Sequence, residues 1–238
     1  MIISKKTHNQ TPNFIDGAVI LIHKELNWTS FDVVRKIHVL LRKKLNVKKI
    51  KVGHAGTLDP LAMGLLIVCT GKATKTINEY QGLPKEYIAE IKLGATTPSS
   101  DLETEIDYEY KTDHISEEMI ADSIESFIGE SDQIPPLFSA KKINGKRAYD
   151  LARAGKTQEM KPSRITIHEA ELISASIPTI TARFLCSKGT YIRSIARDLG
   201  ERLESGSHLT GLVRTKIGEF SLNDALSIDE FEKILRNS

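Results

Sequence analysis

The apolar run GLLIVCTG, residues 64–71, constrains the fold most, because its β-branched and aliphatic residues are bounded by glycines. Such a run is typical of a buried strand. A second segment, KEYIAEIKLGA at residues 85–95, places apolar side chains at every other position, as a strand in an antiparallel sheet does. The chain is therefore expected to fold around a sheet.

Helical and strand-like patterns alternate along the rest of the chain. Ser30 is predicted to cap a helix, and Ser227-x-x-Glu230 is a capping box for the last helix. The other expected elements are an amphipathic helix at 116–129, a short helix ending at Gly155, strands at 164–176, 178–189 and 211–220, and a helix at 190–203. With no internal repeat or long linker, residues 1–238 are predicted to form one mixed α/β (α+β) domain with largely antiparallel strands.

Charge is distributed unevenly, although the net charge is only +2. Residues 35–51 carry eight Lys or Arg and no acid, and residues 141–164 carry eight Lys or Arg and two acids. Between them, residues 101–132 carry twelve acids and one lysine. The basic segments fit RNA phosphates or are solvated helix faces, and charge alone does not decide between these interpretations.

Several classes of protein are disfavoured. No signal peptide and no run approaching about 20 apolar residues is present, which predicts a cytoplasmic protein without membrane spans. Cys69 and Cys186 lie in apolar strand-like runs, where reduced, buried thiols are common. The sequence contains neither a Cys-x-x-Cys nor a His-x-x-x-His spacing, so a metal site is not predicted. The glycine-rich dinucleotide motif, the P-loop and the serine nucleophile elbow are missing from the sequence.

Asp59 lies in KVGHAGTLDPLAMGLL, between a Gly-His-x-Gly turn and a proline. An Asp before Pro is commonly a turn former. Here Gly53 and Gly56 allow close approach of the backbone, and Pro60 with the apolar run shields the carboxylate, so a chemical role is the alternative. A shielded carboxylate needs a cation.

Other residues are open to two interpretations each. Arg193, at the start of the predicted helix, is either a bidentate partner for Asp59 or a surface arginine. His54 is a general base or a local hydrogen-bonding group of the turn. Tyr87 and Tyr191 stack on a base or fill the core.

Several segments together resemble the TruB family, the bacterial tRNA pseudouridine-55 synthases. GHAGTLDPLAMGLLIVCTGKATK resembles the catalytic motif, and HKELNWTSFDVV, KEYIAEIKLGATTPSSD, PPLFSAKKINGKRAYDLARAG, CSKGTYIRSIARDLG and LVRTKIGEF follow in family order. Glu25 and Asn27 stand where the family usually has Pro and Gly, and Ala55 where it often has Thr. The resemblance covers residues 17–236. It implies the pseudouridine synthase fold, with a catalytic cleft.

The resemblance also implies a reaction, the isomerisation of uridine 55 in the T-loop of tRNA to pseudouridine, and the residues that serve it. Asp59 is then the essential carboxylate of an enzyme that uses neither a metal nor an organic cofactor. Tyr87 is expected to stack on the flipped uracil and Arg193 to pair with Asp59. Tyr191 and Leu212 are expected to line the same pocket. His54 is expected to enter the T-loop of tRNA where the flipped bases had been.

The expected partner is the T-arm stem-loop of tRNA, bound by a monomer that needs no other protein. Many family members carry a C-terminal RNA-binding PUA domain, and we expect this chain to be the catalytic domain alone. One alternative is an RNA-binding or tRNA-folding module in which Asp59 is structural. Another is a guide-RNA-dependent uridine isomerase, which would depend on additional domains and partners.

Overall fold

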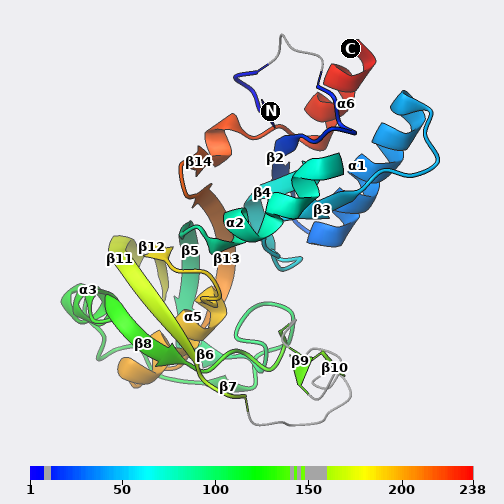
Figure 1. Cartoon of the computed structure of the whole chain (residues 1–238). Helices are drawn as coiled ribbons and strands as arrows, with labels where there is room; N and C mark the ends of the chain where they lie inside the picture. The colour runs from blue at the N-terminus through cyan, green and yellow to red at the C-terminus, as the bar shows by residue number, and fades with distance from the viewer. Residues whose placement is uncertain (8–11, 140–141, 144–145, 148–159, 238) are drawn as a thin grey trace. The chain divides into compact units, whose positions relative to one another are not determined.

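Figure 1 shows the computed structural model of the chain, which describes residues 1–7, 12–139, 142–143, 146–147 and 160–237. The chain divides into two compact units. The first unit comprises Met1–Tyr87 and Leu212–Ser238, and the second comprises Ile88–Gly211.

The first unit is built on a mixed sheet whose central strand is β4. Its strands are β1 (Ile2–Ile3), β2 (Val19–Lys24), β3 (Val52–His54), β4 (Ala62–Thr70), β13 (Ser207–Ile217, which starts in the second unit) and β14 (Phe220–Ser221). β2 runs antiparallel to β4 along one edge. Along the other edge, β3 pairs with β4 near Val68 and β13 pairs parallel to it near Ala62. Both partners thus flank the loop that precedes β4.

Helices cover both faces of this sheet. The helices are α1 (Ser30–Leu45), the 3₁₀ helix η1 (Gly71–Thr76), α2 (Ile77–Gly82), the 3₁₀ helix η2 (Leu222–Asp224) and α6 (Ile228–Asn237). Leu66 and Val68 of β4 pack in one core cluster with α1 and α6. Leu65 and Ile67 point to the other face and pack toward α2. The run GLLIVC is buried throughout because each face of its strand meets a helical layer.

The cap of α1 differs from the prediction. Thr29, not Ser30, is the N-cap: its hydroxyl accepts from the Asp32 N–H at 3.0 Å, and the Asp32 carboxylate accepts from the Thr29 N–H at 3.1 Å. This reciprocal pair is a capping box. Ser30 is the first helical residue, so its hydroxyl is available for another contact.

In the second unit the strand order is β5-β12-β11-β8, with antiparallel β12–β11 and β11–β8 pairs. Its strands are β5 (Lys85–Leu93, which starts in the first unit), β6 (Ala95–Thr96), β7 (Tyr108–Glu109), β8 (Gly129–Gln133), β9 (Lys142–Ile143), β10 (Lys146–Arg147), β11 (Ser163–Ser176) and β12 (Thr179–Cys186). Helix α3 (Glu117–Glu125) packs on β11, and α5 (Ile192–Arg202) buries Ile195 and Leu199.

The mixed α/β class and the largely antiparallel pairing are confirmed, with β1–β2 and β4–β13 as parallel pairs. The Ser227 capping box of α6 is also confirmed: the Glu230 N–H donates to the Ser227 hydroxyl at 3.1 Å. The short helix expected before Gly155 lies outside the described residues, and the single-domain expectation stays a prediction. Among the helices that the structure describes, none is long and apolar enough to cross a membrane.

Candidate active site

Asp59 lies in the loop between β3 and β4, at the edge where β13 also pairs. The loop starts with the Ala55 N–H donating to the Ile67 carbonyl at 2.9 Å and ends with the Ala62 N–H donating to the Asp59 carbonyl at 3.1 Å. Gly56 has a φ of +113°, in the region that favours glycine. Asp59 is half-buried, between the buried Leu58 and the exposed Pro60. Asp59 is therefore partly accessible to solvent, and the apolar side chain of Leu58 next to it is buried.

Arg214, on β13, holds this loop from one side. Its side chain is buried, and every hydrogen bond that it donates in the described structure goes to a main-chain carbonyl. Nε donates to Leu65 O at 2.8 Å, Nη2 to Gly56 O at 3.1 Å and Nη1 to Thr57 O at 3.5 Å. The guanidinium thus joins the first part of the loop to β4.

Helix α1 and the turn before it hold the loop from the other side. The Ser30 hydroxyl accepts from the Leu58 N–H at 2.9 Å and donates to the Leu58 carbonyl at 3.3 Å. The Asn27 N–H donates to the Pro60 carbonyl at 2.9 Å. Both residues next to Asp59 in the chain are therefore anchored.

Lys24, the last residue of β2, is a buried cation close to Asp59. Its side chain is fully buried, and Nζ donates to the Trp28 carbonyl at 2.6 Å and the Glu25 carbonyl at 3.0 Å. Burial lowers the pKa of Lys24 to about 8, the negative charge of Asp59 opposes that shift, and the charge of Arg214 adds to it. Sequence analysis did not single out Lys24 or Arg214. Lys24 does lie in the family-like segment HKELNWTSFDVV, but its burial was not foreseen.

His54 ends β3, five residues before Asp59. Burial lowers the pKa of its imidazole, and the positive charge of Arg214 lowers it further. The ring is therefore neutral at physiological pH. Its expected entry into the T-loop of tRNA stays a prediction.

Tyr87 and Leu212 also belong to the first unit. Leu212 on β13 pairs in register with Ala62, three residues after Asp59, so β-sheet pairing brings it beside the loop. Tyr87 lies on β5 with 9% of its surface exposed. Their expected roles in a uracil pocket stay predictions.

Arg193 lies in the first turn of α5, in the second unit, as the sequence predicted. Its side chain is 4% exposed, and Nη2 donates to the Phe138 carbonyl at 2.8 Å and Nη1 to the Ser99 carbonyl at 3.3 Å. Nε lies 3.5 Å from Oδ2 of Asp101, whose side chain is 7% exposed. Asp101 is thus a buried acid that the sequence analysis did not identify, although it ends the family-like segment KEYIAEIKLGATTPSSD.

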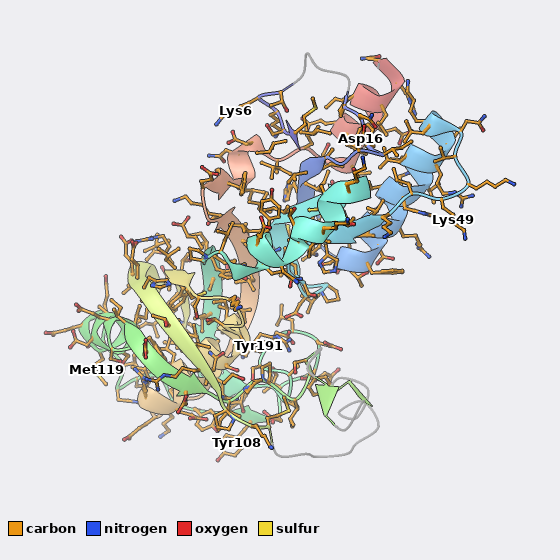
Figure 2. All side chains as sticks on the ribbon, viewed as in Figure 1. Lys6, Asp16, Lys49, Tyr108, Met119 and Tyr191 are labelled. Atoms are coloured by element: carbon orange, nitrogen blue, oxygen red, sulfur yellow. The ribbon has the colours of Figure 1, made fainter. Side chains whose placement is uncertain are left out.

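Tyr191 immediately precedes α5 and is labelled in Figure 2. Its main chain is held by the buried Gln133: the Tyr191 N–H donates to Oε1 at 2.8 Å, and Nε2 donates to the Tyr191 carbonyl at 3.1 Å. Tyr191 and Arg193 are thus fixed at one end of α5. The expected pairing of Asp59 with Arg193 stays a prediction.

The first basic segment is exposed. All eight of its Lys and Arg residues face solvent, and Figure 2 places Lys49 in the stretch between α1 and β3. Two of them have acidic neighbours: Arg35 lies 3.5 Å from Asp32, and Lys36 lies 3.9 Å from Glu232. Most of the second basic segment lies outside the described residues. Within the described part of the chain, no three His, Cys, Asp or Glu side chains form a metal-binding group.

Comparison with known proteins gives consistent matches. The family model described as TruB family pseudouridylate synthase (N terminal domain) matches residues 42–192. A tRNA pseudouridine synthase B from Phocaeicola vulgatus is 57% identical over 223 residues, covering 94% of this chain and 95% of that protein. Another, from Flavobacterium johnsoniae, is 52% identical over 224 residues, covering 94% and 98%.

A solved structure has a similar fold. A chain of a Cbf5-Nop10-Gar1 complex matches with a TM-score of 0.68 and 25% identity, over 97% of this chain and 58% of that one. The segment around Asp59 falls inside the range that the family model matches. The chain belongs to the TruB family of pseudouridylate synthases.

Proposed function

We propose that this enzyme isomerises uridine 55 in the T-loop of tRNA to pseudouridine, with Asp59 as its catalytic carboxylate. Relatives of nearly the same length, more than 50% identical to this chain, are named tRNA pseudouridine synthase B. The substrate is thus supported by the names of those proteins, and the role of Asp59 by the site.

The reaction needs an ionised carboxylate that is sheltered from bulk water. Uracil must be detached from C1′, rotated and rejoined through C5, and hydrolysis is the competing outcome. Asp59 attacks the sugar, attacks the base or takes a proton from C2′; each course uses the carboxylate as a nucleophile or a base, which requires the ionised form. One carboxylate suits this exchange better than the acid–base pair that glycosidases use to activate water.

The surroundings of Asp59 meet this requirement, and this is the observation that carries the proposal. Lys24 is a buried cation close enough for its pKa to respond to the charge of Asp59. A nearby positive charge favours the ionised carboxylate. Leu58 on one side and Ala62 at the start of β4 are 4% and 2% exposed, so apolar atoms back the loop.

The remaining site residues are proposed to handle the flipped nucleotide. Tyr87 stacks on the uracil, Tyr191 and Leu212 complete the pocket, and Arg193 pairs with Asp59. The neutral His54 fills the space that the flipped bases leave. Stacking and insertion offset the cost of extruding a nucleotide, which is on the order of a few kcal/mol.

The exposed basic segment is proposed to bind tRNA phosphates. Arg42, Lys43 and Lys48 line a surface hollow of about 510 Å³ beside the end of α1. Replacing Lys43, Lys48 and Lys49 with glutamine should weaken tRNA binding and reduce its dependence on salt concentration. With fewer phosphate contacts, fewer counterions are released from the RNA on binding. An unchanged salt dependence would place the RNA elsewhere.

We further propose that the protein acts in the cytoplasm as a monomer and that residues 1–238 function as one catalytic domain. A T-arm stem-loop should then be converted nearly as well as whole tRNA. Sedimentation of the protein with and without the stem-loop, combined with conversion assays on both RNAs, tests these statements.

The decisive experiment is to map pseudouridine in an unmodified tRNA transcript after incubation with purified protein. Wild-type protein should convert uridine 55 without guide RNA, and Asp59→Ala should not, while binding tRNA with similar affinity. Asp16→Ala is the matched control, because Asp16 is an exposed aspartate of the same unit, ion-paired with Lys72 at 2.8 Å. Full conversion by Asp59→Ala would remove Asp59 from the catalytic role. Wild-type protein that binds tRNA without converting it would instead favour an RNA-binding or tRNA-folding module with a structural carboxylate.

A further inference from the structure

Two side chains from distant parts of the sequence converge on the backbone of the Asp59 loop. We propose that Ser30 and Arg214 are positioning residues, which set the place of the Asp59 carboxylate during isomerisation through the main chain on either side of it. The proposal rests on the proposed function. It gives two residues that could serve the fold alone a role in placing the reacting carboxylate.

Arg214 is placed to fix the shape of the loop before Asp59. The Gly56 and Thr57 carbonyls lie in irregular backbone, outside any sheet pairing, and the guanidinium supplies donors to both of them. Its third contact, from Nε to the Leu65 carbonyl, ties the same group to β4. A planar fork with donors in fixed directions constrains three carbonyls at once, which a flexible ammonium group does not.

Burial strengthens this interpretation of Arg214. The residue is 1% exposed, and its hydrogen bonds within the described structure go to carbonyls. Burying a guanidinium is costly unless its hydrogen bonds are satisfied, and an apolar side chain would fill a core at lower cost. The arrangement is therefore explained by what the guanidinium holds, which is the loop that carries Asp59.

Ser30 acts at the residue directly before Asp59. Its hydroxyl is buried at 2% exposure and contacts both the N–H and the carbonyl of Leu58. Because Thr29 caps α1, the Ser30 hydroxyl is not needed for the helix terminus. Its contacts bind the loop to the first turn of α1 and so fix the peptide plane that leads into Asp59.

Positioning of this kind affects rate more than affinity. Displacing a reacting group by about 1 Å costs on the order of 100-fold in rate, even when the change lies outside the chemistry. Neither Ser30 nor Arg214 is proposed to touch RNA. Loosening the loop should therefore slow the chemical step and leave tRNA binding nearly unchanged.

The test uses single-turnover conversion of tRNA by full-length protein in excess. Ser30→Ala should lower the maximal rate on the order of 10- to 100-fold, and the protein concentration at half-maximal rate should change less than about twofold. Ser227→Ala is the matched control, because it removes a serine hydroxyl that caps α6 in the same unit. It should lower the melting temperature and leave the rate unchanged.

The variant Arg214→Lys is a second, independent test of the proposal. It keeps the positive charge but not the fork, so the rate should fall again with affinity preserved. If both residues act through one loop, the double variant should lose less rate than the product of the two single losses. Should the Arg214 variant fail to fold, Ser30→Ala still decides the question.

Two results would overturn the proposal. One is a Ser30→Ala protein that turns over at the wild-type rate, and the other is one whose loss lies wholly in affinity. Wild-type protein that fails to convert tRNA would contradict the proposed function instead, so the two failures are distinguishable.

Discussion

The two units each bury an arginine, and the two arginines have different partners. Arg214 is 1% exposed and donates to three main-chain carbonyls around the Asp59 loop. Arg193 is 3% exposed and has the carboxylate of Asp101 beside it, as well as two carbonyls. The difference indicates that one arginine shapes backbone, whereas the other is a charge held in place by a second charge. Burial alone would not have separated these two roles.

The largest effect is expected from Arg193→Ala. Removing one partner of a buried pair leaves an uncompensated charge on Asp101, which costs about 3–5 kcal/mol in the free energy of unfolding. Conversion of uridine should fall sharply as well, because Asp59 loses the cation that is proposed to keep it ionised. Urea unfolding and single-turnover assays measure the two effects.

A double variant separates these effects. Arg193→Ala with Asp101→Ala should recover part of the stability, because Asp101 is no longer a buried charge without its partner, but none of the conversion. Recovery of both would mean that Arg193 serves the fold alone. Conversion that Arg193→Ala leaves unchanged would remove Arg193 from the site.

A smaller effect, visible in the pH dependence of stability, is expected from Lys24, the cation near Arg214. The pKa of Lys24 is lowered from 10.5 to about 8 in the folded protein. Between these values the unfolded chain binds a proton that the folded chain has lost, so stability from this group increases with pH across that window. The gain is up to roughly 3 kcal/mol, and below pH 8 the contribution of Lys24 to the slope vanishes.

The measurement compares wild-type protein with Lys24→Met by urea unfolding at a series of pH values from 7 to 10. The difference between the two free energies of unfolding isolates Lys24 from the other groups that titrate in this range. The free energy of unfolding of the wild type should increase relative to that of Lys24→Met as the pH rises. A difference that is constant with pH would show that Lys24 is not buried as a cation.

Local sequence pattern was enough to predict most elements that the structure describes. The run GLLIVC and the alternation of KEYIAEIKLGA each gave the correct strand, because side-chain periodicity reports which faces are buried. Asp59 and Arg193 were proposed as site residues from the family-like segments, and their roles stay predictions. Ser30 was predicted as the N-cap of α1, but Thr29-x-x-Asp32 is itself a capping-box pattern, so the true N-cap, Thr29, can also be recognised from the sequence.

The support of the site was not predictable in the same way. Arg214 lies in a strand-like segment, GLVRTKIGEF, and the carbonyls that it contacts carry no sequence signature. Lys24 and Asp101 are charged residues next to apolar strands or loops, where solvent exposure is the ordinary expectation. Lys24 and Arg214 are buried where β2 and β13 pair with β4 at Gly64, and Asp101 is buried beside Arg193 of α5; these are long-range features.

A third expected effect tests what the carboxylate contributes to Arg193. Asp101→Asn keeps the shape of the side chain and removes its charge. Asp101 forms an ion pair with Nε of Arg193 at 3.5 Å, so the free energy of unfolding should fall, but by less than in Arg193→Ala, because the guanidinium keeps its two carbonyl acceptors. The conversion rate should fall less than in Arg193→Ala, because the guanidinium remains. A rate as low as that of Arg193→Ala would make Asp101 an equal partner in the site.

The smallest effect is expected at an arginine that also pairs with carboxylates but is accessible to solvent. The side chain of Arg183 on β12 is 25% exposed and lies 3.0 Å from Glu171, whose side chain is 58% exposed. Exposed pairs are worth about 0–1 kcal/mol, because water and salt screen them. Glu171→Gln should thus lower the free energy of unfolding by less than about 1 kcal/mol and leave conversion unchanged. If Glu171→Gln cost as much as Asp101→Asn, burial would not be what gives the Arg193–Asp101 pair its greater value.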